Sequence, residues 1–156
     1  MTCVDTSFLC ALYRKQDNST RALAFRAGMP GPLSVSRLLL WEFRQSTRFQ
    51  AFRHRHKPSL GFPIHEAEKM ISDLKEDLDA GQVVVAELDV PNILTLAERI
   101  SKTRTFLGGH RSFDVLHVAA AIEMDADIFL SFDANQNALA ASEGLSTPLA
   151  AHSLEA

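Results

Sequence analysis

The chain has 156 residues, a formal net charge of −3 and 46% hydrophobic residues. A chain of this length buries roughly 70% of its unfolded surface on folding, so we expect a single domain over residues 1–156 with a full core. The small net charge excludes a general attraction to nucleic acid or to a membrane surface, and any anionic partner must meet a local basic patch.

The sequence also argues against a cysteine-rich protein and against a membrane protein. The only cysteines, Cys3 and Cys10, lack the number and spacing of a metal site or a disulfide framework, and we interpret them as small hydrophobic residues. No apolar run approaches the roughly 18 residues that span a bilayer, and no basic leader follows Met1. We therefore expect a cytoplasmic protein without a membrane partner.

Short apolar segments alternate with helical patterns along the chain. Strands are expected at 2–5, 33–36, 82–88 and 127–133. Helices are expected at 6–15, 19–28, 37–57, 64–81, 89–102, 112–126 and 134–144. The β-branched run Val83–Val85 predicts a strand buried on both faces. The alternation predicts an α/β fold with helices on both faces of a mostly parallel sheet.

Four acidic residues lie where strands turn into helices. Asp5 ends the first expected strand and Asp133 ends the last, while Asp114 and Glu42 lie in the opening turns of two helices. Because parallel strands about 4.8 Å apart share one carboxyl edge, we expect these carboxylates to lie close together. Their mutual repulsion calls for a cation, and oxygen ligands favour Mg²⁺ or Mn²⁺ over Zn²⁺.

Each of these residues also has an ordinary structural interpretation. Asp5 and Asp133 can cap the helices that follow them, because a carboxylate accepts hydrogen bonds from free backbone N–H groups. Asp114 can complement a helix dipole and Glu42 can face water. One such residue alone favours the structural interpretation, whereas four at one sheet edge favour a site.

A basic segment follows Glu42. Residues 44–57 contain no acid, and the positive charges and aromatic rings are those of Arg44, Arg48, Arg53, Arg55, Lys57, Phe49 and Phe52. This composition is typical of a surface that binds RNA, where basic side chains contact the phosphates and unpaired bases stack on the aromatic rings. The alternative is a solvated helix face whose phenylalanines belong to the core. Arg104, His110 and Arg111 form a second candidate rim near the acidic residues.

Four segments, taken in order, resemble a PIN domain of the VapC type of toxin ribonuclease. They are "VDTS" at 4–7, "SVSRLLLWEF" at 34–43, "SFDVLHVAAAIEMDADIFLSFD" at 112–133 and "ANQNALA" at 134–140. The resemblance spans nearly the whole chain, and the third segment is its most specific part. Residues 53–81 are longer than the same region of the smallest members, and they can shape a groove or a dimer surface.

The resemblance implies a three-layer α/β/α fold and metal-dependent cleavage of RNA. It implies that Asp5, Asp114 and Asp133 ligate Mg²⁺ or Mn²⁺ directly or through water, and that Glu42 either ligates the ion or orients the attacking water. Supporting positions carry Thr6, Ser131 and Gln136, and the candidate RNA contacts are Arg44, Arg48, Arg53 and Arg111. We interpret His117, one turn after Asp114, as a packed structural residue.

The resemblance also implies two partners, an RNA substrate and a cognate antitoxin that blocks the site. We further expect a homodimer. Two alternatives come from other classes. An aspartyl-phosphate phosphatase or receiver-like domain also has Asp after its first strand, but the phosphatase needs a second Asp where this chain has Ser7. A non-catalytic module that binds nucleic acid or a partner on the same fold remains open.

Overall fold

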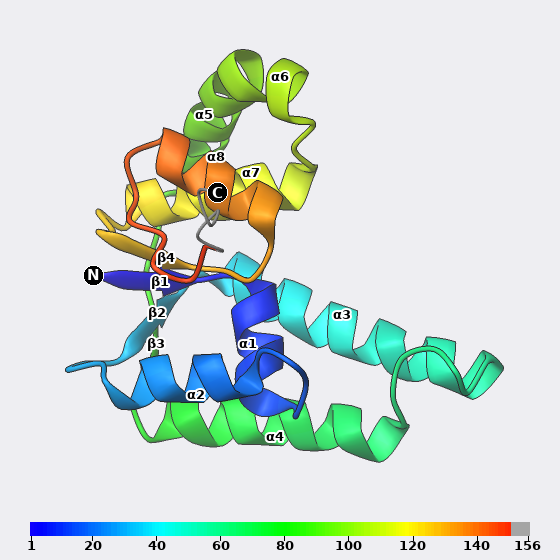
Figure 1. Cartoon of the computed structure of the whole chain (residues 1–156). Helices are drawn as coiled ribbons and strands as arrows, with labels where there is room; N and C mark the ends of the chain where they lie inside the picture. Colours follow the sequence, from blue (N-terminus) through cyan, green and yellow to red (C-terminus); the bar gives the residue numbers. More distant parts are fainter. Residues whose placement is uncertain (151–156) are drawn as a thin grey trace, which may run out of the picture.

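One parallel sheet forms the centre of the protein, whose computed structural model describes residues 1–150. Its four strands lie in the order β3-β2-β1-β4 (Figure 1). The bounds of these strands are Thr2–Val4 for β1, Leu33–Val35 for β2, Val83–Val85 for β3 and Ile128–Leu130 for β4. All three neighbouring pairs are parallel, so the carboxyl ends of the strands meet at one edge.

Helices make every connection between consecutive strands. They are α1 (Thr6–Tyr13), α2 (Ser19–Ala27), α3 (Arg37–His56), α4 (Ile64–Asp79), α5 (Val90–Ile100), α7 (Ser112–Glu123) and α8 (Ala134–Ser142). A π-helix, η1 (Ser101–Thr105), and a short α6 (Phe106–Gly108) prolong α5 beyond the end that the sequence pattern predicted. Pro91 lies in the first turn of α5, where its missing N–H would have no helical partner anyway.

The buried side chains form two clusters, and each cluster packs one layer of helices against the sheet. Val4 and Leu130 pack with residues of α1 to α4, whereas Cys3 and Phe129 pack with residues of α5, α7 and α8. Successive strand residues point to opposite faces, and the register Cys3↔Phe129 and Val4↔Leu130 places like-facing side chains next to each other. Figure 1 shows these layers above and below the sheet, which confirms the predicted three-layer α/β/α fold.

The prediction that Val83–Val85 is buried on both faces was wrong. β3 is an edge strand that pairs only with β2 among the described residues, and the side chain of Val84 is 37% exposed. A β-branched composition indicates a strand, but it does not distinguish the edge of a sheet from its centre.

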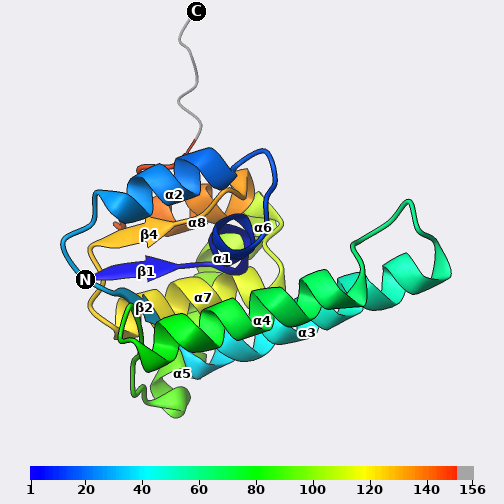
Figure 2. The same ribbon diagram turned by 90° about the horizontal axis from the view of Figure 1, so that it is seen from below.

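The helices α3 and α4 pack against each other as an antiparallel hairpin. Their connected ends extend away from the sheet (Figure 2), so residues 53–63 form the tip of an arm. The amino-terminal half of α3 belongs to the body of the protein, where Leu39 and Phe43 are buried. Within residues 1–150, no helix combines the length and apolar character needed to cross a membrane.

Candidate functional site

The site begins where β1 and β4 end. The backbone N–H of Asp5 donates to the carbonyl of Leu130 at 3.0 Å, which continues the ladder by one residue and places Asp5 beside Ser131. The Ser131 hydroxyl then donates to Asp5 Oδ2 at 2.6 Å. The pairing of two parallel strands therefore brings together side chains that are 126 residues apart in sequence.

Asp5 is almost completely buried, with 2% of its surface exposed. Its Oδ1 accepts hydrogen bonds from the Ser7 hydroxyl at 2.7 Å and from the backbone N–H of Phe8 at 2.9 Å, so Asp5 also caps α1. Burial raises the pKa of Asp5, and the hydrogen bonds from Ser131, Ser7 and Phe8 oppose that rise. The carboxylate of Asp5 thus both caps α1 and contributes to the site.

Glu42 points from α3 toward a pair of donors rather than freely into water. Its Oε2 accepts a hydrogen bond from Thr6 and lies 2.6 Å from Nε2 of His117. Burial acts to raise the pKa of Glu42, but the hydrogen bonds from His117 and Thr6 outweigh it and lower the pKa. An ionised carboxylate only accepts hydrogen bonds, so Nε2 of His117 carries the proton.

The burial of His117 agrees with its interpretation as a packed structural residue, and the structure adds a contact with a site residue. His117 is 5% exposed and contacts Glu42 across 75 residues of sequence. One local signal pointed to this role: residues three apart on a helix share a face, so His117 lies on the same side of α7 as Asp114.

Asp114 and Asp133 share one positive charge, the guanidinium of Arg111. Nε of Arg111 lies 3.0 Å from Asp114 Oδ2, and Nη2 lies 3.3 Å from Asp114 Oδ1 and 3.2 Å from Asp133 Oδ2. Asp133 also caps α8 by accepting from the backbone N–H of Gln136 at 3.0 Å. Arg111, predicted as an RNA contact, lies against the two carboxylates in this structure.

A pocket of about 280 Å³ collects these groups. The structure brings all four acidic candidates to its lining, together with Thr6, Gln136, Arg111 and His117. Two buried polar atoms of the lining, Nε2 of Gln136 and Oγ1 of Thr47, have no hydrogen-bond partner among residues 1–150. Both atoms lie beneath the pocket surface rather than on it.

The acidic side of this pocket has the donors that a hard divalent cation prefers. In residues 1–150 no group of three or more His, Cys, Asp or Glu side chains is arranged to hold a metal ion. Asp114 and Asp133 nevertheless already share a cation, and Asp5 lines the same pocket. The type of donor therefore fits Mg²⁺ or Mn²⁺, while in this structure Arg111 supplies the positive charge between two of the carboxylates.

None of the basic side chains of the segment 44–57 lines this pocket, although Ser46, Thr47 and Gln50 of the same segment do. Arg48 and Arg55 line a different cavity between α3 and α4, and Arg44 and Arg53 are half-buried on α3. The alternative that the phenylalanines of this segment belong to the core was wrong. Phe49 and Phe52 are 52% and 55% exposed, and their rings stack with centroids 6.0 Å apart.

Comparisons with known proteins agree with this architecture. A family model of the PIN domain matches residues 2–142, and a comparison with curated proteins found no match. Among solved structures, the chain is similar to Mycobacterium tuberculosis VapC20, which is described as a sarcin-ricin loop cleaving toxin. That likeness has a TM-score of 0.64 at 16% identity and covers 94% of this chain and 97% of VapC20.

Two further structures extend the likeness in fold. FitAcB from Neisseria gonorrhoeae has a TM-score of 0.60 at 16% identity, with 94% of this chain and 96% of that chain covered. PAE2754 from Pyrobaculum aerophilum has a TM-score of 0.51 at 15% identity, with 94% and 87% covered. At such identities the structures support the fold alone. Because the family model spans nearly the whole chain, this protein belongs to the PIN domain family.

Proposed function

We propose that this protein is a metal-dependent endoribonuclease that acts in the cytoplasm as the toxin of a type II toxin–antitoxin pair. The observation that carries the proposal is the convergence of Asp5, Glu42, Asp114 and Asp133 on one pocket from four separate segments. Clustered carboxylates repel one another, so a pocket built from them is stable chiefly with a cation present. Membership of a family of nucleases supports the same conclusion.

Asp5, Asp114 and Asp133 would hold the ion, which when bound would lower the pKa of a water molecule and stabilise charge on phosphate oxygens. Glu42 has its Oε2 held by Thr6 and His117, while Oε1 accepts no hydrogen bond from residues 1–150. Oε1 is therefore the oxygen that can ligate the ion or accept a proton from water. Hydrolysis by this route would leave a 5′-phosphate and a 3′-hydroxyl.

The substrate side of the proposal depends on donors in the same pocket. Gln136 lines the pocket, and its buried Nε2 has no hydrogen-bond partner among the described residues. Arg111 lies at the mouth of the pocket with 73% of its side chain exposed. The Arg111 guanidinium supplies hydrogen-bond donors and positive charge beside an acidic centre that otherwise repels RNA.

The decisive experiment compares cleavage of single-stranded RNA by the wild type, Asp5→Asn and Asp114→Asn, with Mg²⁺ or Mn²⁺ and with EDTA. We expect EDTA or either substitution to reduce the rate at least about 100-fold. Asp79→Asn is the matched control, since Asp79 is an exposed aspartate of α4 that pairs with Lys75. Equal rates in all variants would remove the nuclease assignment, and binding without cleavage by the wild type would favour a non-catalytic module.

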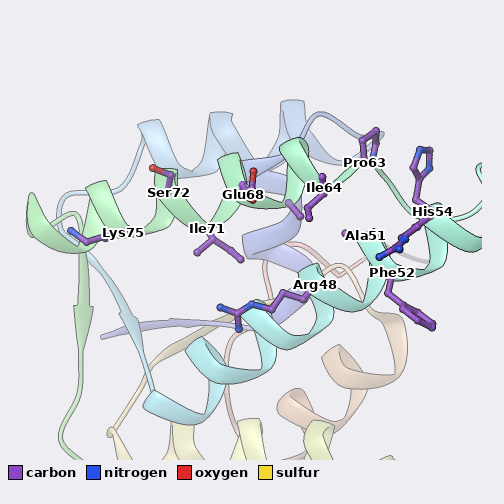
Figure 3. A pocket seen from close by; sticks show the side chains of 12 residues that line it. Arg48, Ala51, Phe52, His54, Pro63, Ile64, Glu68, Ile71, Ser72 and Lys75 are labelled. Atoms are coloured by element: carbon purple, nitrogen blue, oxygen red, sulfur yellow. The ribbon is translucent and has the colours of Figure 1, made fainter.

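We further propose that the antitoxin binds in the groove between α3 and α4, which has a volume of about 1030 Å³. Ile64 and Ile71 extend from α4 toward α3 in Figure 3, and Arg48 lies on the opposite helix. Arg48 and Arg55 form no ion pair within residues 1–150, whereas Glu68 is the only acidic residue of the described lining. This charge balance suits an apolar segment that carries acidic residues.

The groove can be tested by protection from growth arrest in a bacterial host that also expresses the antitoxin encoded with this protein. Ile64 is 67% exposed, so Ile64→Asp is expected to spare the fold and the nuclease but to abolish protection. Val90→Asp on α5, at a side chain 60% exposed, is the control and should leave protection intact. Full protection of the Ile64→Asp variant would exclude this groove.

The homodimer stays a prediction, to be measured by light scattering.

A further inference from the structure

We propose that Arg111 has two alternative partners: the Asp114–Asp133 pair in the metal-free protein, and an RNA phosphate once a divalent cation has replaced its guanidinium. This inference rests on the proposed function. In this inference Arg111 competes with the metal for the carboxylates and, once displaced, contacts the substrate.

The guanidinium lies between the two carboxylates. Its Nε and Nη2 atoms reach both oxygens of Asp114, at 3.0 and 3.3 Å, and Nη2 also reaches Asp133 at 3.2 Å. Asp114 is on α7 and Asp133 follows β4, so Arg111 joins two segments of like charge. Within residues 1–150 no other basic side chain is paired with either aspartate.

The geometry makes this guanidinium replaceable. The Arg111 side chain is 73% exposed, whereas that of Asp114 is 8% exposed. An ion pair that reaches water on one side contributes little to stability, because solvent screens it and a long side chain must be held in place. A divalent cation has twice the charge and approaches oxygen ligands to about 2.0–2.2 Å, so it binds the same two carboxylates more strongly.

The displaced side chain stays close to the site. Arg111 is the N-cap residue of α7, and its backbone N–H donates to Asp114 Oδ2 at 3.2 Å. The anchored backbone keeps the side chain within reach of the site, and its 73% exposure leaves it room to turn outward at the mouth of the pocket. A planar guanidinium binds phosphate through two parallel hydrogen bonds, and positive charge is what RNA needs beside an acidic centre.

The two partners predict opposite effects of a single substitution. In Arg111→Gln, Mn²⁺ binding measured by calorimetry should tighten about fivefold, because the competing ion pair is lost. At saturating Mn²⁺, KM for single-stranded RNA should rise about tenfold, because one charged phosphate contact is lost. Arg111→Lys keeps the charge without the planar fork, and both changes should be smaller.

Arg37→Gln is the matched control, since Arg37 is also exposed and pairs with a single acid, Glu87, outside the pocket. It should change neither quantity by more than twofold. Unchanged or weaker Mn²⁺ binding in a folded Arg111→Gln protein would overturn the inference while leaving the proposed nuclease intact. Failure of the wild type to bind Mn²⁺ would overturn both.

Discussion

The hydrogen bond between His117 and Glu42 gives a prediction about both stability and activity. His117→Ala removes the donor that lies 2.6 Å from Glu42 Oε2 and leaves Thr6 as the only described donor to that oxygen. The two side chains are 4% and 22% exposed, so water replaces the lost hydrogen bond poorly. Loss of a hydrogen bond to a charged group costs about 1.5–3 kcal/mol.

The expected loss can be measured by thermal unfolding followed by circular dichroism. For a chain of this length about 1 kcal/mol corresponds to a change in Tm of about 2–4 °C, so a loss of about 2 kcal/mol lowers Tm by about 4–8 °C. Removal of the ring also leaves a cavity, which adds to the cost. His117→Gln restores a donor at similar reach and should recover part of the loss.

A double-mutant cycle separates the hydrogen bond from the cavity. In a Glu42→Ala background, His117→Ala should cost less than in the wild type by about 1.5–3 kcal/mol, which is the coupling between the two side chains. Equal costs in both backgrounds would refute the reasoning. For RNA cleavage, we expect kcat of His117→Ala to fall about 10–100-fold with little change in KM, because Glu42 loses its orientation.

Two further predictions concern the fold that carries the site. Burial raises the pKa of Asp5, so the unfolded chain releases this proton at lower pH than the folded protein does, and the folded state loses stability as pH rises above the ordinary value of 3.8. In EDTA, Asp5→Asn should therefore unfold at a higher temperature than the wild type at pH 7. Below about pH 3, where the Asp5 carboxyl is protonated in both states, the two proteins should unfold at the same temperature. A lower unfolding temperature of Asp5→Asn at pH 7 would mean that the three hydrogen bonds to Asp5 outweigh the effect of its burial. Gly61 has φ +66°, and a Cβ there would lie 2.1 Å from the carbonyl oxygen of Gln50, which lines the acidic pocket. In urea unfolding, Gly61→Ala should lower the free energy of unfolding by more than the about 1–2 kcal/mol expected for a left-handed residue. Gly81→Ala is the control, since Gly81 has φ +70° and open space around it, and it should cost only that amount. Equal losses in the two variants would show that the loop at Gly61 moves away from Gln50 freely.

Local sequence patterns were sufficient for the architecture. Apolar runs of three to five residues, helical periodicity and turn residues such as Gly81 are properties of neighbouring positions, and they predicted the order of strands and helices. The position of Asp5 and Asp133 after two such strands also predicted that they lie at one sheet edge, because parallel strands place their carboxyl ends together.

The contacts of the site depend on chain segments that are far apart. Nothing local to Glu42 identifies His117 as its partner, because that contact exists only after α3 and α7 have packed on the sheet. The same holds for Arg111, which the sequence presents as a free cation near Asp114 and which the fold places against Asp133 as well.

The sequence by itself thus determined the layers of the protein and the edge at which its acidic residues collect, since both follow from local periodicity and from the direction of the strands. Only the tertiary structure decided which strand became the edge of the sheet, which donors hold Glu42, and which charge lies between Asp114 and Asp133. Those features depend on long-range packing, where the energy of a charged group is set by neighbours from other parts of the chain.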